Sequence, residues 1–187
     1  MAIDEEGVRK AVRLFLTSIG ENPDREGLLE TPDRIARACE EIFSGLGRSR
    51  RRCCPSVSRS RPMKWCWCAT SSCSRCASII CCRSTRRACR LHPVQRQVVG
   101  LSKLARLVEL YARRPQVQER ITQQVADALM EYADAKGVIV VTECEHMCMA
   151  MRGVNKPASR TITSAVRGVM RTPATRAEAM SLIMAKH

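Results

Sequence analysis

One segment of the chain, residues 48–97, differs in composition from everything around it. It holds nine of the twelve cysteines, both tryptophans and thirteen lysines or arginines, and it contains no aspartate or glutamate. The rest of the chain has nineteen basic and eighteen acidic residues, so the net charge of +14 is local to this segment. A basic balance usually favours a nucleic acid or an anionic membrane as partner. Because the charge is confined to one segment, we expect neither partner for the protein as a whole.

The length of 187 residues suits one domain with a real hydrophobic core. No apolar run is long enough to span a bilayer. The charged start MAIDEEGVRK lacks an apolar export signal, so we expect a cytoplasmic protein. Twelve cysteines would suit a secreted disulfide scaffold, but their lopsided distribution and the missing export signal argue against one.

Apolar residues at helical spacing predict several helices outside the anomalous segment. These helices are expected at 8–19, 31–45, 98–114 and 117–136, with a last one that begins at Thr175. In the second helix, Thr31 suits the N-cap and Pro32 the first helical position.

Two stretches, 138–151 and 159–166, read as strands. Helices with few strands predict the α+β class. The chain divides into a helical region 1–47, the anomalous segment 48–97 and a remainder 98–187.

The predicted strand 138–151 carries three groups with metal-binding chemistry. Alternate side chains of a strand share a face, so Cys144, His146 and Cys148 are expected to point the same way. Two thiols and an imidazole are suitable zinc ligands. Alternatively, both cysteines are small buried hydrophobic residues and His146 is a hydrogen-bonded core histidine, and spacing alone favours this interpretation.

Basic residues gather near the same point in the sequence. Ser102, Lys103 and Arg106 lie on one turn at the start of a predicted helix, and Arg152 follows the predicted strand. Arginine forks and lysine charges complement phosphate oxygens, and helix N-termini favour anions, so this set could hold a polyphosphate. Taken alone, the set is better explained as a solvated helix face.

Several long strings of the sequence, in the same order, closely resemble the GTP cyclohydrolase I family. They are VVGLSKLARLVELYARRPQVQERIT, ECEHMCMAMRGVNKP, TSAVRG and PATRAE. The string GLLETPDRIARACEEIFSGL resembles the helical lead-in of the same family. The resemblance covers about 20–47 and 98–185, which is some two-thirds of the chain.

The resemblance implies a fold, an assembly and a reaction. The fold is the T-fold, an antiparallel sheet with two long helices on one face and N-terminal helices outside it. The assembly is a toroidal homodecamer with sites between subunits. The reaction converts GTP and water to 7,8-dihydroneopterin triphosphate and formate, the entry to folate-type pterins. It uses one zinc ion, which would activate the attacking water.

The resemblance also assigns roles to residues of this chain. Cys148 matches a zinc ligand, and His146 matches a histidine that transfers protons beside the reacting ring. Glu119, with Gln118, matches the residues that hold the guanine edge. The residues that match the triphosphate holders are Ser102, Lys103, Arg106 and Arg152. Arg34 is expected to reach a neighbouring subunit's site, and Cys144 is expected to serve packing alone.

The family's other two zinc ligands lie in a Cys-Glu-His-His string that this sequence lacks. The string belongs near Cys76 to Ile80, inside the anomalous segment. The chain as written therefore has one zinc ligand of three, and it lacks the second catalytic histidine and the first hairpin of the sheet.

A shifted reading frame accounts for the anomaly. Codons permitted for Met63–Thr85, read from the last base of each codon, spell EMVLVRDIELFSMCEHHLLPFH without a stop. The last base of Ser78 with Ile79, and the last base of Ile79 with Ile80, for example, conceal two histidine codons when each of these last bases is C. Codons permitted for Arg90–Gln97, read from the second base of each codon, spell GYIPSSGK, which again resembles the sequence of the family. We therefore interpret 48–97 as a frameshifted translation.

The alternative takes the segment literally, as a cysteine-rich zinc module or a basic nucleic-acid-binding module. Its ligands would come from Cys66, Cys68, Cys73, Cys76, Cys81 and Cys82. The Cys-x-x-Cys pair at Cys73 and Cys76 is a weak pattern without a second, well-spaced pair.

Overall fold

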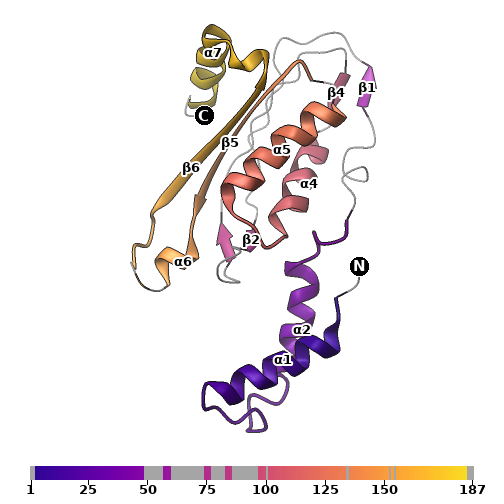
Figure 1. Cartoon of the computed structure of the whole chain (residues 1–187), viewed down its shortest axis with the longest axis vertical. Helices are drawn as coiled ribbons and strands as arrows, with labels where there is room; N and C mark the ends of the chain where they lie inside the picture. Colours follow the sequence, from indigo (N-terminus) through magenta and orange to yellow (C-terminus); the bar gives the residue numbers. More distant parts are fainter. Residues whose placement is uncertain are drawn as a thin grey trace.

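The computed structural model describes residues 3–48, 101–133, 135–151, 153 and 155–184, and the backbone of four short strands between 57 and 99. Figure 1 shows a hairpin of two N-terminal helices next to a body in which two further helices lie along a long two-stranded ribbon. The α+β class expected from the sequence is confirmed.

The N-terminal hairpin consists of α1 (Glu5–Ser18) and α2 (Thr31–Ile42). Asp4 caps α1, because its Oδ1 accepts from the backbone N–H of Gly7 at 2.9 Å. Arg9 joins the two helices, since its Nε donates to Oδ1 of Asp33 at 2.6 Å. This hydrogen bond raises the pKa of the Arg9 guanidinium.

The expected N-cap of α2 is wrong by one residue. Thr31 is already helical, and Glu30 occupies the cap position with helical backbone angles. The reason is local: the backbone N–H of Thr31 donates to the carbonyl of Leu28 at 2.9 Å, so a turn leads directly into the helix. Pro32 is buried and lies in the first turn of α2. The fixed φ angle of proline favours this position in a helix.

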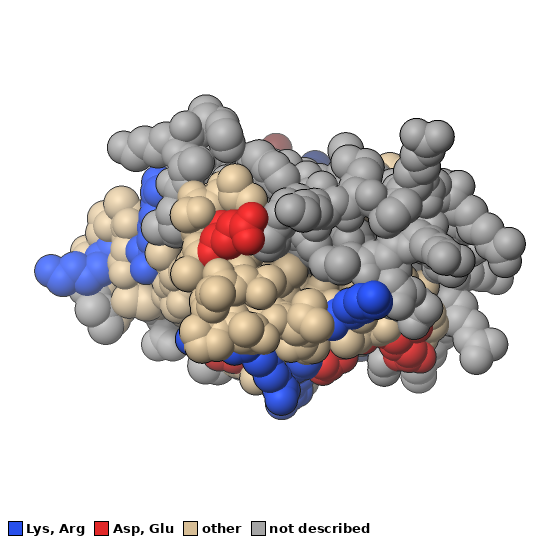
Figure 2. All heavy atoms as spheres, turned by 90° about the horizontal axis from the view of Figure 1, so that it is seen from above, with Lys and Arg blue, Asp and Glu red and all other residues tan. Residues whose placement is uncertain are grey.

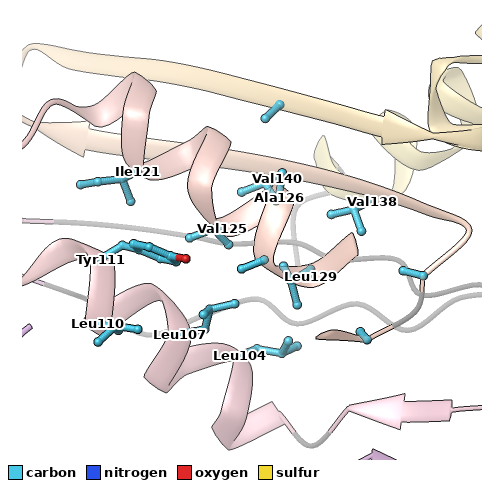
Figure 3. Packing of buried hydrophobic residues seen from close by; sticks show 14 residues of the cluster. Leu104, Leu107, Leu110, Tyr111, Ile121, Val125, Ala126, Leu129, Val138 and Val140 are labelled. Atoms are coloured by element: carbon cyan, nitrogen blue, oxygen red, sulfur yellow. The ribbon is translucent and has the colours of Figure 1, made fainter. Parts of the chain in front are cut away.

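The body contains an antiparallel pair of helices, α4 (Leu101–Ala112) and α5 (Gln118–Tyr132). The short connection between them makes antiparallel packing the natural arrangement. Figure 3 shows Leu104 beside Leu129 at one end of the pair, and Tyr111 beside Ile121 at the other. The core is therefore a layer of mainly aliphatic side chains, with the ring of Tyr111, between the helices and the ribbon.

The ribbon pairs β5 (Gly137–Glu145) with β6 (Arg160–Gly168) in antiparallel register, with Thr142 opposite Thr163. Val138 and Val140 join the core under α5. Ile139 packs instead with η1 (Val169–Arg171) and α7 (Pro173–Met184). The alternation expected of a strand thus gives each face of β5 its own apolar partner.

Gly168 ends the ribbon in a conformation that only glycine tolerates. Its φ is +60°, and a Cβ built there would lie 2.0 Å from the carbonyl oxygen of Lys136. The chain can therefore turn from β6 into η1 without a steric clash.

The predicted strand 138–151 is wrong in its last part. β5 ends at Glu145, and a helical turn, α6 (Met147–Ala150), follows. The backbone N–H groups of Met149 and Ala150 both donate to the carbonyl of His146. Methionine and alanine favour helix, and this local preference ends the strand.

Four short strands lie within or beside the anomalous segment. β1 (Val57–Arg59) pairs with β4 (Gln97–Val99), and β2 (Ser74–Cys76) pairs with β3 (Arg83–Thr85), both antiparallel. β2 lies beside α4, and β3 lies beside β5. Among the described strands, neither pair joins the β5–β6 ladder. That 48–97 replaces the first hairpin of a larger sheet stays a prediction.

The described surface carries charges of both signs. Seen from above, lysine and arginine side chains are scattered among acidic and uncharged residues (Figure 2). Across the described residues, none of the helices has the length and apolar composition needed to cross a bilayer.

Leu107→Ala is expected to lower the free energy of unfolding by about 2–5 kcal/mol, because it opens a cavity in the core. Leu107 is 0% exposed between α4 and α5. Leu14→Ala, at a position that is 68% exposed on α1, is the control. Urea unfolding at one protein concentration measures both variants. Equal losses of unfolding free energy in Leu107→Ala and Leu14→Ala would show that Leu107 does not belong to the core.

Candidate active site

The first turn of α5 buries a glutamine against the ribbon. Gln118 is 2% exposed, and its Nε2 donates to the backbone carbonyls of Thr142 and Thr161, each at 2.9 Å. These carbonyls belong to β5 and β6, so the side chain joins α5 to both strands. Because carbonyl oxygens only accept, the amide orientation follows from the contacts: Nε2 faces the strands and Oε1 faces away from them.

Oε1 of Gln118 lies 3.0 Å from Nε2 of His146. His146 follows the last residue of β5 and precedes α6, and its backbone is extended. Two residues 28 positions apart in the sequence, both predicted as site residues, are therefore in direct contact.

A cluster of three threonine hydroxyls lies beneath this contact. Thr122 Oγ1 lies 2.7 Å from Thr142 Oγ1 and 2.8 Å from Thr163 Oγ1, and the latter two are 2.6 Å apart. Thr122 Oγ1 also donates to the backbone carbonyl of Gln118 at 2.9 Å. The cluster attaches the first turn of α5 to facing positions of β5 and β6, and so holds Gln118 in place.

The sequence interpretation missed these threonines. Thr142 continues the inward-facing series of Val138 and Val140, and Thr122 follows Gln118 by one helical turn. A hydroxyl at an otherwise apolar inward position is the one signal that could have indicated a buried polar contact.

Glu119 follows Gln118 but is exposed, and no partner for its carboxylate is found among the described residues. Glu119 lies at the end of α5 where Gln118 contacts His146. A carboxylate there can accept two hydrogen bonds from an amidine-like edge such as that of guanine.

Cys148 lies on α6, half-buried and outside any disulfide with another described cysteine. Because α6 interrupts the strand, Cys148 does not continue the alternation of β5, and the expected common face with Cys144 and His146 is wrong. Cys144 is buried on β5, 7% exposed. In the part of the chain that the structure describes, no three His, Cys, Asp or Glu side chains are placed to hold a metal. The described residues alone therefore do not fit a zinc site.

Three of the residues predicted to bind triphosphate lie elsewhere. Ser102 and Lys103 are on the first turn of α4, with Arg106 one turn further. Since α4 and α5 are antiparallel, these residues are at the opposite end of the pair from Gln118 and Glu119 (Figures 1 and 3). Leu129 and Glu119 are ten residues apart on α5, which corresponds to roughly 15 Å along the helix axis. Within the described part of one chain, these three residues and Glu119 therefore do not come together.

Arg34, another predicted residue, is not at this site either. Arg34 lies exposed on α2 and pairs with Glu30, its NH2 2.6 Å from the carboxylate. Arg152 falls outside the described residues.

Arg106 lines a cavity of about 980 Å³ between the end of α2 and α4. The cavity is lined by charges of both signs: Glu40, Glu41, Glu109, Arg48, Arg106 and Arg113. This balance does not select an anion.

Comparisons with known proteins agree with the resemblance of the sequence. The sequence model of the GTP cyclohydrolase I family matches residues 8–184. The GTP cyclohydrolase 1 of Bifidobacterium longum (strain NCC 2705) is 57% identical over 196 residues, covering 98% of this chain and 92% of the relative. The corresponding protein of Streptomyces avermitilis is 51% identical over 191 residues, with coverages of 98% and 92%. That of Mycobacterium leprae (strain Br4923) is 45% identical over 194 residues, with coverages of 98% and 91%. The chain belongs to the GTP cyclohydrolase I family.

Proposed function

We propose that the gene of this chain encodes a zinc-dependent GTP cyclohydrolase I, and that residues 48–97 are a frameshifted reading of its metal-binding segment. The observation that carries the proposal is the contact of His146 with Gln118 beside Glu119, in a chain that its family's sequence model matches from 8 to 184. The reaction takes up one water and releases C8 of the purine as formate. We expect it to occur in the cytoplasm.

Glu119 binds the guanine edge. Its carboxylate accepts from N1–H and from the 2-amino group together, and adenine lacks this pair of donors. Its exposure and lack of a partner in the described structure support this role. His146 contacts Gln118, the residue before Glu119, and holds or moves the proton that ring opening requires.

Ser102, Lys103, Arg106 and Arg152 bind the triphosphate. Because α4 presents the first three at the far end from Glu119, one GTP takes its guanine contacts from one copy of the chain and its phosphate contacts from another. Arg34 reaches the same site from a further copy. The T-fold decamer expected from the resemblance supplies such interfaces, and the β5–β6 ribbon with α4 and α5 on one face would form its unit.

Zinc supplies an activated water when it is bound. The described residues offer one family ligand, Cys148. The other two, a cysteine and a histidine, are encoded by the shifted frame near Cys76 to Ile80. We call the restored chain the protein in which EMVLVRDIELFSMCEHHLLPFH replaces Met63–Thr85 and GYIPSSGK replaces Arg90–Gln97.

Glu119→Gln in the restored chain is expected to reduce kcat/KM for GTP by about 5- to 150-fold, the cost of one mismatched buried hydrogen bond. The amide offers a donor where guanine also has one. Zinc content, measured by atomic absorption, should be unchanged.

Glu178→Gln, which makes the same change on the exposed face of α7, is the control and should leave kcat/KM unchanged. Unchanged turnover of Glu119→Gln would remove Glu119 from the guanine site. Loss of zinc in that variant would instead place Glu119 at the metal.

A further inference from the structure

Both polar atoms of the Gln118 side chain are engaged by the protein itself in the observed position. Nε2 donates its two hydrogens to the backbone carbonyls of Thr142 and Thr161, and Oε1 contacts Nε2 of His146. The residue is 2% exposed. Donation from the Gln118 side chain to guanine, one form of the role that the resemblance implies for Gln118 together with Glu119, would require breaking hydrogen bonds to two strands.

The contact determines which nitrogen of His146 carries the proton. Oε1 is an acceptor only, so the bond at 3.0 Å requires a donor at Nε2 of the imidazole. In the neutral ring the proton is then on Nε2 and the lone pair is on Nδ1.

We propose that Gln118 is a positioning residue, which orients the imidazole of His146 through Oε1 and holds the ring in the Nε2–H tautomer. This inference rests on the proposed function for its chemistry, but the tautomer is a property of the fold. The threonine cluster is the support, because Thr122 fixes the backbone carbonyl of Gln118 and joins Thr142 and Thr163.

The test is long-range ¹H–¹⁵N correlation NMR on the restored full-length chain with ¹⁵N-labelled histidine, at alkaline pH where imidazole is neutral. His146→Gln assigns the signals of His146. The unmutated restored chain should show its proton on Nε2. A proton on Nδ1 would overturn the inference without any variant of Gln118.

Two variants separate positioning from stability. Gln118→Met removes the acceptor and should give a mixture of tautomers, whereas Leu107→Ala costs stability in the core outside this contact and should leave the Nε2–H form intact. An unchanged tautomer in Gln118→Met would contradict the proposal. If Gln118→Met does not fold, Gln118→Asn, which keeps the amide on a shorter stem, replaces it.

Steady-state kinetics distinguishes positioning from guanine contact. Loss of an orienting partner should lower kcat by about 10- to 100-fold with little change in KM. A raised KM with unchanged kcat would show that Gln118 binds guanine directly. If the restored chain has no turnover at all, the proposed function fails, but the NMR result still decides the role of Gln118.

Discussion

The chain as written is expected to form no 7,8-dihydroneopterin triphosphate from GTP, whereas the restored chain is expected to turn GTP over. The expected ratio is about 10⁴ or more, the size of effect that follows loss of a principal catalytic group. The reason is that Cys148 remains the one family ligand, while a catalytic zinc needs three protein ligands. Fluorescence of neopterin, after oxidation and dephosphorylation of the product, measures the turnover, and zinc content is determined alongside.

A matched control is a chain in which GYIPSSGK alone is restored. It lacks the Cys-Glu-His-His string and should be as inactive as the chain as written. Turnover by the chain as written at the rate of the restored chain would show that the metal site has been misplaced. Inactivity of a folded, zinc-loaded restored chain would contradict the proposed reaction.

Cys148→Ser in the restored chain is expected to remove both zinc and turnover. A serine hydroxyl is a poor zinc ligand compared with a thiolate, and two remaining ligands do not complete a catalytic site. Turnover should fall by about 10⁴-fold, as for loss of the metal itself. Zinc content by atomic absorption and product formation from GTP are measured on the same preparations.

Cys144→Ala is the paired control, because Cys144 is buried on β5 and 7% exposed. Removal of the Cys144 thiol should weaken packing around β5 and leave zinc bound. If Cys144→Ala loses zinc while Cys148→Ser keeps it, the third ligand has been assigned to the wrong cysteine.

Much of the core followed from periodicity. Helical spacing brought Ile121, Val125 and Leu129 to one face of α5, and strand alternation brought Val138 and Val140 against it. These patterns are local consequences of burial, so one sequence suffices to read them. The antiparallel order of α4 and α5 follows equally from the short connection between them.

The end of β5 did not follow from the same reasoning. Cysteine and histidine alternate through Cys144, His146 and Cys148, which imitates a strand with one polar face. The helical preference of Met147, Met149 and Ala150 outweighs this alternation, and α6 forms instead. A chemical pattern was therefore mistaken for a structural one, and the role of His146 stays a prediction.

The buried polar network lies beyond a reading of one sequence. Thr122, Thr142 and Thr163 come from three elements, and only tertiary packing brings their hydroxyls together. The direction of the Gln118 amide likewise depends on two strand carbonyls that are distant in sequence. Residue identity alone predicts candidate site residues, but their partners determine what each can do.

The DNA sequence of codons 45–100 tests the frameshift most directly. We expect that DNA, read from the last base of each codon over Met63–Thr85, to spell EMVLVRDIELFSMCEHHLLPFH, with AGC at Ser78 and ATC at Ile79. Read one base in over Arg90–Gln97, it should spell GYIPSSGK. Codons whose shifted reading gives unrelated residues or stops would contradict the frameshift and leave the cysteine-rich segment as the gene's true product.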